Sequence, residues 1–250
     1  MVTVIILAKN EEGNIEECIK TVLWCAEVIV IDDFSTDRTR QIAKKLGAKV
    51  FSRNLDDDFA AQRNFGLEKA SEEWVFFVDA DERVTEKLAS EILNVTGGGY
   101  ASGFYIRRRD VMWGRQLDHG EVGNVWLLRL AKKSAGLWTK RVHEIWGIGS
   151  QVLKLNNPIF HYPHQTLREF IEDINYYSTL HARQKYEDGK HSNLLKILLW
   201  PKLKFLNNWI FRLGFLDGTA GFVHAVLMSF HSFLAWSNLW LWTRELPDQR

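Results

Sequence analysis

The sequence predicts an α/β protein, in which a mostly parallel sheet lies between two layers of helices and is followed by a helical extension rich in aromatic residues. Short, continuous apolar runs rich in β-branched residues recur in the first hundred residues, and polar turns bound each of them. Segments with apolar residues at helical spacing separate these runs. Of the eleven tryptophans, only Trp24 and Trp74 precede residue 100, so the later part of the chain differs in character.

Strands and helices alternate at the spacing of βαβ units, which favours a parallel, three-layer arrangement. Residues 2–8 (VTVIILA) form the first strand, and apolar residues then fall at helical spacing over 15–22. Gly47 follows a predicted helix at the usual C-cap position. The other expected strands are 28–31, 48–51 and 74–78, and the other expected helices are 39–46, 58–70 and 86–95.

The chain changes character after the glycines at 97–99, which mark a flexible joint. Residues 103–109 and 124–130 alternate as strands, with turns rich in glycine and charge between them. From Thr166 onward the pattern becomes helical and stays so. The sequence therefore predicts an α/β part that ends near residue 165 and a helical part from 166 to 250.

Composition and charge argue against several classes of protein. The net charge is +1, from 32 basic and 31 acidic residues, which disfavours a dedicated nucleic-acid binder. Cys18 and Cys25 lie too far apart in one predicted helix to bridge, so we expect reduced thiols in a reducing compartment. The apolar run at the N-terminus has no basic residue before it and no cleavage site, which indicates a buried strand and not a signal peptide. We expect a cytoplasmic catalytic part.

Polar clusters follow three of the predicted strands, at the edge where open parallel sheets bind ligands. We expect these clusters to converge on one crevice. No G-x-G-x-x-G or G-x-x-x-x-G-K-[ST] signature is present, so dinucleotide and P-loop binding lose their main support. The clusters are Ala8-Lys9-Asn10-Glu11, then Asp32, Asp33, Ser35, Thr36 and Asp37, then Asp79-Ala80-Asp81-Glu82.

The Asp79-Ala80-Asp81 segment is the sharpest feature of the sequence. Two carboxylates that flank a small residue at a strand end suit a hard divalent cation, Mg²⁺ or Mn²⁺, which prefers oxygen ligands and bridges to diphosphate oxygens. The alternative is structural, because Asp81 or Thr85 would also serve to cap the following helix. Clusters at matching positions after the other two strands favour the metal site.

Three runs of the sequence resemble family 2 glycosyltransferases with the GT-A fold, and in particular bacterial lipopolysaccharide-core glucosyltransferases. The likeness extends from Val2 to about Tyr162. It implies a GT-A domain at 1–165, with a nucleotide-sugar-binding half at 1–96 and an acceptor half at 97–165. The runs are VTVIILAKNEEGNIEECIKTV, VIVIDDFSTDRT and QRNFGLEKASEEWVFFVDADERV.

The resemblance also implies a donor-binding site. Asp79 and Asp81 would hold the metal and the donor diphosphate, while Arg63 and Asn64 would lie beside the donor. A surface or packing role is the open alternative for Arg63. The full expected donor-binding set is Ala8, Lys9, Asn10, Glu11, Asp33, Ser35, Arg63, Asp79, Ala80 and Asp81.

An inverting transferase also needs a base that takes the proton of the attacking acceptor hydroxyl. We expect Glu144 to be this base, because His143-Glu144 matches a His-Glu pair in relatives; a surface carboxylate is the alternative. Glu121 and Asp118 are further candidates, although the segment LDHGE departs from the family's usual Gly-Gly-Trp. His143, His161 and His164 are open either to a metal or phosphate contact or to a structural role.

The C-terminal part predicts contact with a membrane surface. Residues 190–216 contain no acidic residue, and their lysines and arginine alternate with aromatic residues, which suits a lipid headgroup region. An ordinary helix packed on the α/β domain is the alternative. Residues 218–243 lack charges and are long enough to span a bilayer, but His224 and His231 disfavour a span. We expect a peripheral protein on the inner face of the plasma membrane, with a homodimer contact as another interpretation of this segment.

The expected function is transfer of a sugar, with UDP-glucose as the expected donor, to a lipid-linked or lipopolysaccharide-type glycan in cell-envelope synthesis. One alternative is a polyprenyl-phosphate sugar synthase that uses GDP-mannose or a UDP-sugar. A nucleotidyltransferase is disfavoured, because the segment AKNEEGN is acidic where a basic, glycine-rich loop is usual. A non-enzymatic scaffold with a degenerate GT-A domain is the remaining alternative, and the intact Asp79-Ala80-Asp81 segment argues against it.

Overall fold

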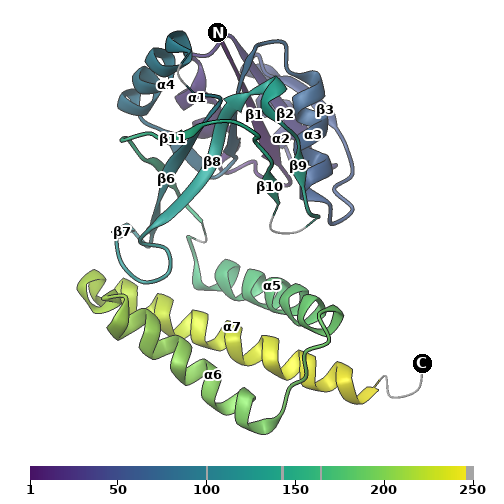
Figure 1. The fold of residues 1–250 in the computed structure, drawn as a ribbon, viewed down its shortest axis with the longest axis vertical. Helices are drawn as coiled ribbons and strands as arrows, with labels where there is room; N and C mark the ends of the chain where they lie inside the picture. The colour runs from purple at the N-terminus through teal and green to yellow at the C-terminus, as the bar shows by residue number, and fades with distance from the viewer. Residues whose placement is uncertain (100, 142–143, 164, 246–250) are drawn as a thin grey trace. The chain divides into compact units, whose positions relative to one another are not determined.

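The computed structural model describes residues 1–99, 101–141, 144–163 and 165–245 (Figure 1). The chain forms two compact units. The first contains Met1–Arg108 and Val125–His161, and the second contains Arg109–Asn124 together with the chain from Tyr162 onward. The helical unit thus begins close to the expected residue 165, but it also includes a hairpin that the sequence placed in the α/β part.

The first unit is built on a mostly parallel sheet, as predicted. Its parallel strands lie in the order β3-β2-β1-β4, and β8 joins the edge of β4 in antiparallel orientation. The remaining order is β6-β12-β5, with β11 and β7 paired to β6. The strands are β1 (Val2–Ala8), β2 (Glu27–Asp32), β3 (Lys49–Ser52), β4 (Trp74–Asp79), β5 (Glu82–Val84), β6 (Gly103–Met112), β7 (Arg115–Leu117), β8 (Val125–Lys132), β11 (Val152–Lys154) and β12 (Ile159–His161).

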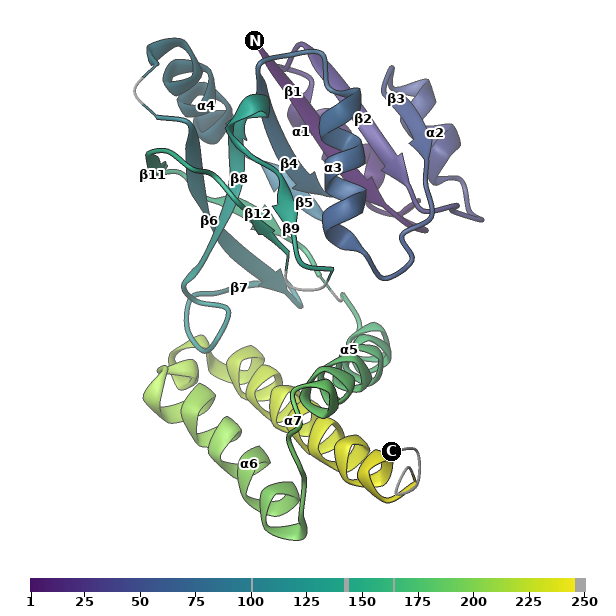
Figure 2. The same ribbon diagram turned by 45° about the vertical axis from the view of Figure 1, so that its right-hand side comes forward.

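Helices cover both faces of this sheet, which confirms the three-layer prediction (Figure 2). Val4 and Ile6 of β1 face α1 (Ile15–Val22), whereas Ile5 faces α3 (Phe59–Lys69). This alternation explains why β1 is apolar at every position except Thr3: both of its faces are buried. Two more helices, α2 (Thr39–Lys45) and α4 (Glu86–Gly98), pack on the same face as α1. The opposite face, which α3 covers, also holds a hairpin of two short strands, β9 (Trp138–Thr139) and β10 (Ile145–Trp146).

Glu27 joins the start of β2 to neighbouring segments. Its carboxylate accepts hydrogen bonds from Thr3 Oγ1 at 2.7 Å, from Ser71 N at 3.0 Å and from Lys49 Nζ at 2.6 Å. Burial alone would raise the pKa of Glu27, but the bonds from Lys49, Ser71 and Thr3 prevail and lower it to about 2. The native state therefore holds this carboxylate ionised over a wider pH range than the unfolded chain does.

We expect Glu27→Gln to lower the free energy of unfolding by about 1–3 kcal/mol at pH 7, because Thr3, Ser71 and Lys49 lose their charged acceptor. Since the native pKa lies below the unfolded value, this stabilisation is complete above about pH 4.5 and is lost as the pH falls toward 2. Urea unfolding of the wild type and the variant at pH 7 and pH 3 measures both effects. The exposed Glu17→Gln is the control. An equal difference in the free energy of unfolding between wild type and Glu27→Gln at both pH values would refute the ionic role of Glu27.

The second unit consists of three long helices and the hairpin Arg109–Asn124. The helix α7 (Gly218–Glu245) packs against both α5 (Leu167–Glu187) and α6 (Leu194–Leu206). A π-helical turn η2 (Asn207–Phe211) and a short helix η3 (Gly214–Asp217) join α6 to α7.

The hairpin packs with these helices through a small apolar core and through Asp217, which accepts hydrogen bonds from His119 N at 2.9 Å and lies 2.8 Å from His119 Nδ1. These contacts explain why the hairpin belongs to the helical unit. An aromatic cluster lies at the α6–α7 junction, where Trp209 contacts Phe205, Phe215 and Phe222. Within the described part of the chain, one helical stretch, Gly214–Arg244, has the length and apolar composition needed to cross a membrane.

Candidate active site

The carboxyl ends of β1, β2 and β4 lie side by side at one edge of the sheet. Ala8 of β1 is in register with Asp32 of β2, and Leu7 is in register with Asp79 of β4. The polar residues that follow these strands therefore meet at this edge, where open parallel sheets bind ligands.

The loops after β1 and β2 are joined by direct hydrogen bonds. Lys9 Nζ lies 2.7 Å from Asp33 Oδ2, and Asp33 N donates to Ala8 O at 2.9 Å. Asn10 N donates to Ser35 Oγ at 2.9 Å. Asp33 is buried, so its carboxylate is fixed in position. The structure thus gathers the predicted donor-binding residues of these two loops into one surface.

Glu11 links this surface to the carboxylates after β4. Burial, together with the negative charges of Asp81, Asp37 and Asp79, raises the pKa of Glu11 to about 7, against a hydrogen bond with Asn14 that lowers it. The carboxylates of Glu11, Asp37, Asp79 and Asp81 therefore act on one another at this edge of the sheet. A cation bound among them would offset their charge against that of a diphosphate.

Asp79 forms ion pairs with two buried arginines, Arg129 and Arg63. Arg129 of β8 contacts both of its carboxylate oxygens, and Arg63 Nη2 lies 3.4 Å from Oδ1. Burial alone would raise the pKa of Asp79, but the charges of Arg129 and Arg63 hold it well below its ordinary value. Glu82 is also fully buried, accepts a hydrogen bond from Asp79 N at 2.8 Å, and has a pKa that burial raises.

Arg63 connects Asp79 to Glu144. It lies on α3 and is 5% exposed, which rules out a surface role. Its Nε donates to Glu144 Oε1 at 2.9 Å. Its guanidinium carbon lies 5.3 Å from the ring centre of Phe77 and 4.8 Å from that of Trp138, so two aromatic faces hold the charge in place. Three predicted site residues, Arg63, Asp79 and Glu144, therefore form one connected group.

Asp81 has a different environment from Asp79. Its Oδ2 lies 3.1 Å from His161 Nε2, and β12 brings His161 opposite Glu82 of β5. The Asp81 carboxylate is the kind of ligand that a divalent cation of the Mg²⁺ or Mn²⁺ type prefers, and such an ion commonly takes few protein ligands and completes its shell with water and substrate phosphates. Among the described residues, no set of three or more His, Cys, Asp or Glu side chains is arranged to hold a metal. A cation here would thus depend on donor oxygens.

The other candidate residues either belong to the second unit or lie outside the described residues. Glu121 and Asp118 belong to the helical unit, where Glu121 pairs with Lys204 and Asp118 pairs with Arg109. His143 and His164 lie outside the described residues. Arg129 was not predicted as a site residue, and Glu82 was predicted only as a member of the polar cluster after β4.

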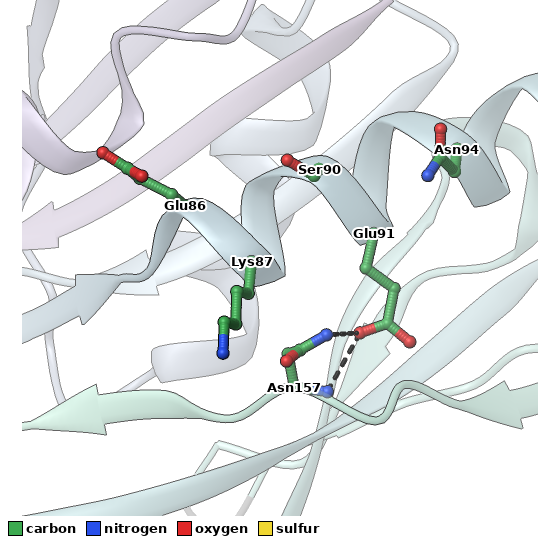
Figure 3. Close-up of a pocket in the computed structure, with 6 residues that line it drawn as sticks. All are labelled: Glu86, Lys87, Ser90, Glu91, Asn94 and Asn157. Atoms are coloured by element: carbon green, nitrogen blue, oxygen red, sulfur yellow. Dashed lines mark hydrogen bonds between the residues drawn. The ribbon is translucent and has the colours of Figure 1, made fainter.

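A shallow surface cavity on α4 contains none of the predicted site residues (Figure 3). Glu91 accepts hydrogen bonds there from Asn157 N at 2.9 Å and Asn157 Nδ2 at 2.7 Å, which fastens the turn before β12 to α4. The role of Glu91 is structural. The cavity is lined by Glu86, Lys87, Ser90, Glu91, Asn94 and Asn157.

The fold and the carboxylate pair after β4 define the class of the first unit as a GT-A-type transferase domain. Residues 3–154 match the family described as glycosyl transferase family 2. The chain belongs to this family and is therefore a glycosyltransferase.

Relatives and solved structures agree with this assignment. The chain is 29% identical over 245 residues to the lipopolysaccharide core biosynthesis glycosyltransferase LpsC of Rhizobium meliloti, which covers 94% of this chain and 90% of the relative. It is 26% identical over 253 residues to an uncharacterized glycosyltransferase of Rickettsia typhi, covering 95% and 86%. The structure of S. aureus TarS 1–349 in complex with UDP-GlcNAc shares the fold, with a TM-score of 0.50 and 14% identity over 93% of this chain and 81% of that one.

Proposed function

We propose that this glycosyltransferase transfers a sugar from a nucleotide diphosphate donor, with UDP-glucose as the expected donor, and inverts the anomeric centre. The observation that carries the proposal is the ion-paired group Arg129–Asp79–Arg63–Glu144. Asp81 lies next to this group, and so do the loops after β1 and β2, which fix Asp33 in position. It places a carboxylate, two fixed positive charges and a candidate cation ligand in one site.

Glu144 is proposed as the base. Its carboxylate accepts the proton of the acceptor hydroxyl while the acceptor oxygen bonds to the anomeric carbon. The bond between that carbon and the donor diphosphate breaks, and its electron pair leaves with the diphosphate. Arg63 holds Glu144 in position through the 2.9 Å bond and keeps positive charge next to the site.

Asp81, with His161 beside it, is proposed to hold Mg²⁺ or Mn²⁺ together with the donor diphosphate. The cation supplies charge neutralisation of the departing diphosphate. We assign Asp79, the other expected metal ligand, to positioning Arg129 and Arg63, because both of its oxygens face these arginines. Ala80 separates the two carboxylates and is itself buried.

The proposed acceptor is a lipid-linked or lipopolysaccharide-type glycan. The name of the Rhizobium meliloti relative, which the chain matches over most of both lengths, supports lipopolysaccharide core biosynthesis. We propose further that the protein is cytoplasmic and associates with the inner face of the plasma membrane through residues 190–243, whose exposed apolar side chains support such contact.

The proposed function is tested by incubating the purified protein with a panel of nucleotide sugars, with and without EDTA. We expect hydrolysis or transfer with a UDP-sugar in the presence of Mn²⁺ or Mg²⁺ and loss of this activity with EDTA, because a cation offsets the charge of the departing diphosphate. Added Mn²⁺ should restore the activity. Full turnover in EDTA would contradict the metal dependence, and no turnover of any donor would favour a non-catalytic scaffold.

A further inference from the structure

The outer surface of α6 is apolar. None of the residues of α6, all of which the structure describes, is buried. The apolar surface continues into η2, where Phe211 is 78% exposed. In water, such a contiguous patch of large apolar side chains is rare on a folded protein and marks a contact site. The exposed large apolar residues of this surface include Leu194, Leu195, Leu198, Leu199, Leu203 and Phe211.

Two cations of α6 turn toward the protein instead of toward solvent. Lys204 pairs with Glu121 of the hairpin. Lys196 Nζ donates to His191 O at 2.6 Å and lies 5.3 Å from the ring centre of Trp236 on α7. A water-facing helix has the reverse arrangement, with charges outward and leucines inward. The inverted arrangement of α6 fits an apolar surrounding and not an aqueous one.

The same surface continues along α7. Phe222, Val226, Phe230 and Phe233 are exposed at a spacing of three to four residues, so they form one stripe on this helix. Phe222 contacts the rings of Phe205 at the end of α6 and Trp209 in η2, which joins the stripe to the α6 surface.

The helix α5 differs from α6 in exposing charged residues beside apolar ones such as Leu167 and Ile171. These charges limit how the unit can meet a bilayer. Because α7 packs along α5, a bilayer-spanning α7 would bring the charges of α5 into hydrocarbon at high cost. An orientation with α6 toward lipid and α5 toward water avoids this cost. The exposed charged residues of α5 are Arg168, Glu169, Glu172, Arg183 and Glu187.

We propose that α6, η2 and the exposed stripe of α7 lie in the plane of the membrane within the acyl-chain layer of one leaflet, while α5 faces water. Lys202 and Arg212 are exposed on this segment and can reach anionic headgroups from it. The occupant is therefore a bilayer that contains anionic lipid. This inference rests on the membrane association proposed above and is independent of the transfer chemistry.

Vesicle binding by two matched variants tests the orientation. Leu199 on α6 and Ile171 on α5 are each 45% exposed, so glutamate at either position leaves the core intact. We expect Leu199→Glu to weaken cosedimentation with phosphatidylglycerol-containing vesicles by roughly a hundredfold, because a charge in the acyl layer is unfavourable. Ile171→Glu should bind like the wild type. Equal loss in both variants, or loss only in Ile171→Glu, overturns the proposal.

Depth measurements separate insertion from attachment to the headgroups. Nitroxide labels are placed at Leu198→Cys and, separately, at Ile171→Cys in a Cys25→Ser background. With bound vesicles, the label at 198 should collide mainly with oxygen and the label at 171 mainly with a water-soluble nickel chelate. A water-exposed label at 198 contradicts insertion. Donor hydrolysis by the wild type without vesicles tests the transferase proposal separately, so the two can fail independently.

Discussion

Replacing Glu144 with glutamine is expected to lower kcat by about 10²–10⁴-fold, the usual contribution of a positioned general base. The amide oxygen of glutamine can still accept the hydrogen bond from Arg63 Nε, so the arrangement of the site should persist. The KM for the donor should change little, because Glu144 acts on the acceptor proton. Steady-state kinetics with varied donor and a hydroxyl acceptor measures both quantities.

Glu121→Gln is the matched control. Glu121 was a rival candidate from the sequence, but it pairs with Lys204 in the helical unit. We expect this variant to turn over donor at nearly the wild-type rate. Loss of activity in Glu121→Gln together with normal activity in Glu144→Gln would overturn the assignment of the base. Normal transfer to the hydroxyl acceptor by both variants would mean that neither carboxylate is the base.

The two carboxylates after β4 are expected to respond differently to substitution. Asp79→Asn leaves the buried guanidinium groups of Arg129 and Arg63 without their shared counter-charge. We expect it to lower the free energy of unfolding on the order of 3 kcal/mol. Asp81→Asn should unfold at nearly the wild-type denaturant concentration but lose metal-dependent turnover. Urea unfolding and donor hydrolysis measured on both variants test this division.

The reverse pattern would refute the division of roles. If Asp81→Asn were the destabilised variant and Asp79→Asn the one that folds normally but is inactive, Asp79 would be the main metal ligand. A conservative substitution of Arg129 gives a further check of its ion pair with Asp79. Arg129→Lys retains a positive charge beside Asp79, and it should recover part of the stability that Arg129→Met loses.

Local sequence patterns were sufficient to predict the central fold. The run at 2–8 is apolar except for Thr3 because both faces of β1 are buried. The polar residues after β1, β2 and β4 meet because parallel strands end at one edge. Pairing between strands that are far apart in the sequence was harder to predict. Arg129 reaches Asp79 because β8 joins β4 in a register that sets Leu130 opposite Phe76, and His161 reaches Asp81 through β12. No local pattern specifies such antiparallel pairings.

The helical unit illustrates a second limit of sequence reasoning. Residues 190–216 are rich in both cations and apolar residues, so the sequence alone predicted lysines facing lipid headgroups. The structure turns Lys196 and Lys204 toward the protein and leaves Lys202, Arg212 and the leucines exposed. This orientation follows from acceptors on distant segments, Glu121 and Trp236 among them, that periodicity cannot reveal.

The central claim is that Asp81 binds a divalent cation together with the donor diphosphate. The most direct measurement is a Mn²⁺ titration followed by electron paramagnetic resonance in the presence of UDP, with the wild type and Asp81→Asn. We expect the wild type to bind one Mn²⁺ per chain and Asp81→Asn to bind it at least about a hundredfold more weakly, since even substitutions next to metal ligands commonly cost 10–100-fold. Unchanged Mn²⁺ affinity in a folded Asp81→Asn protein would contradict the account.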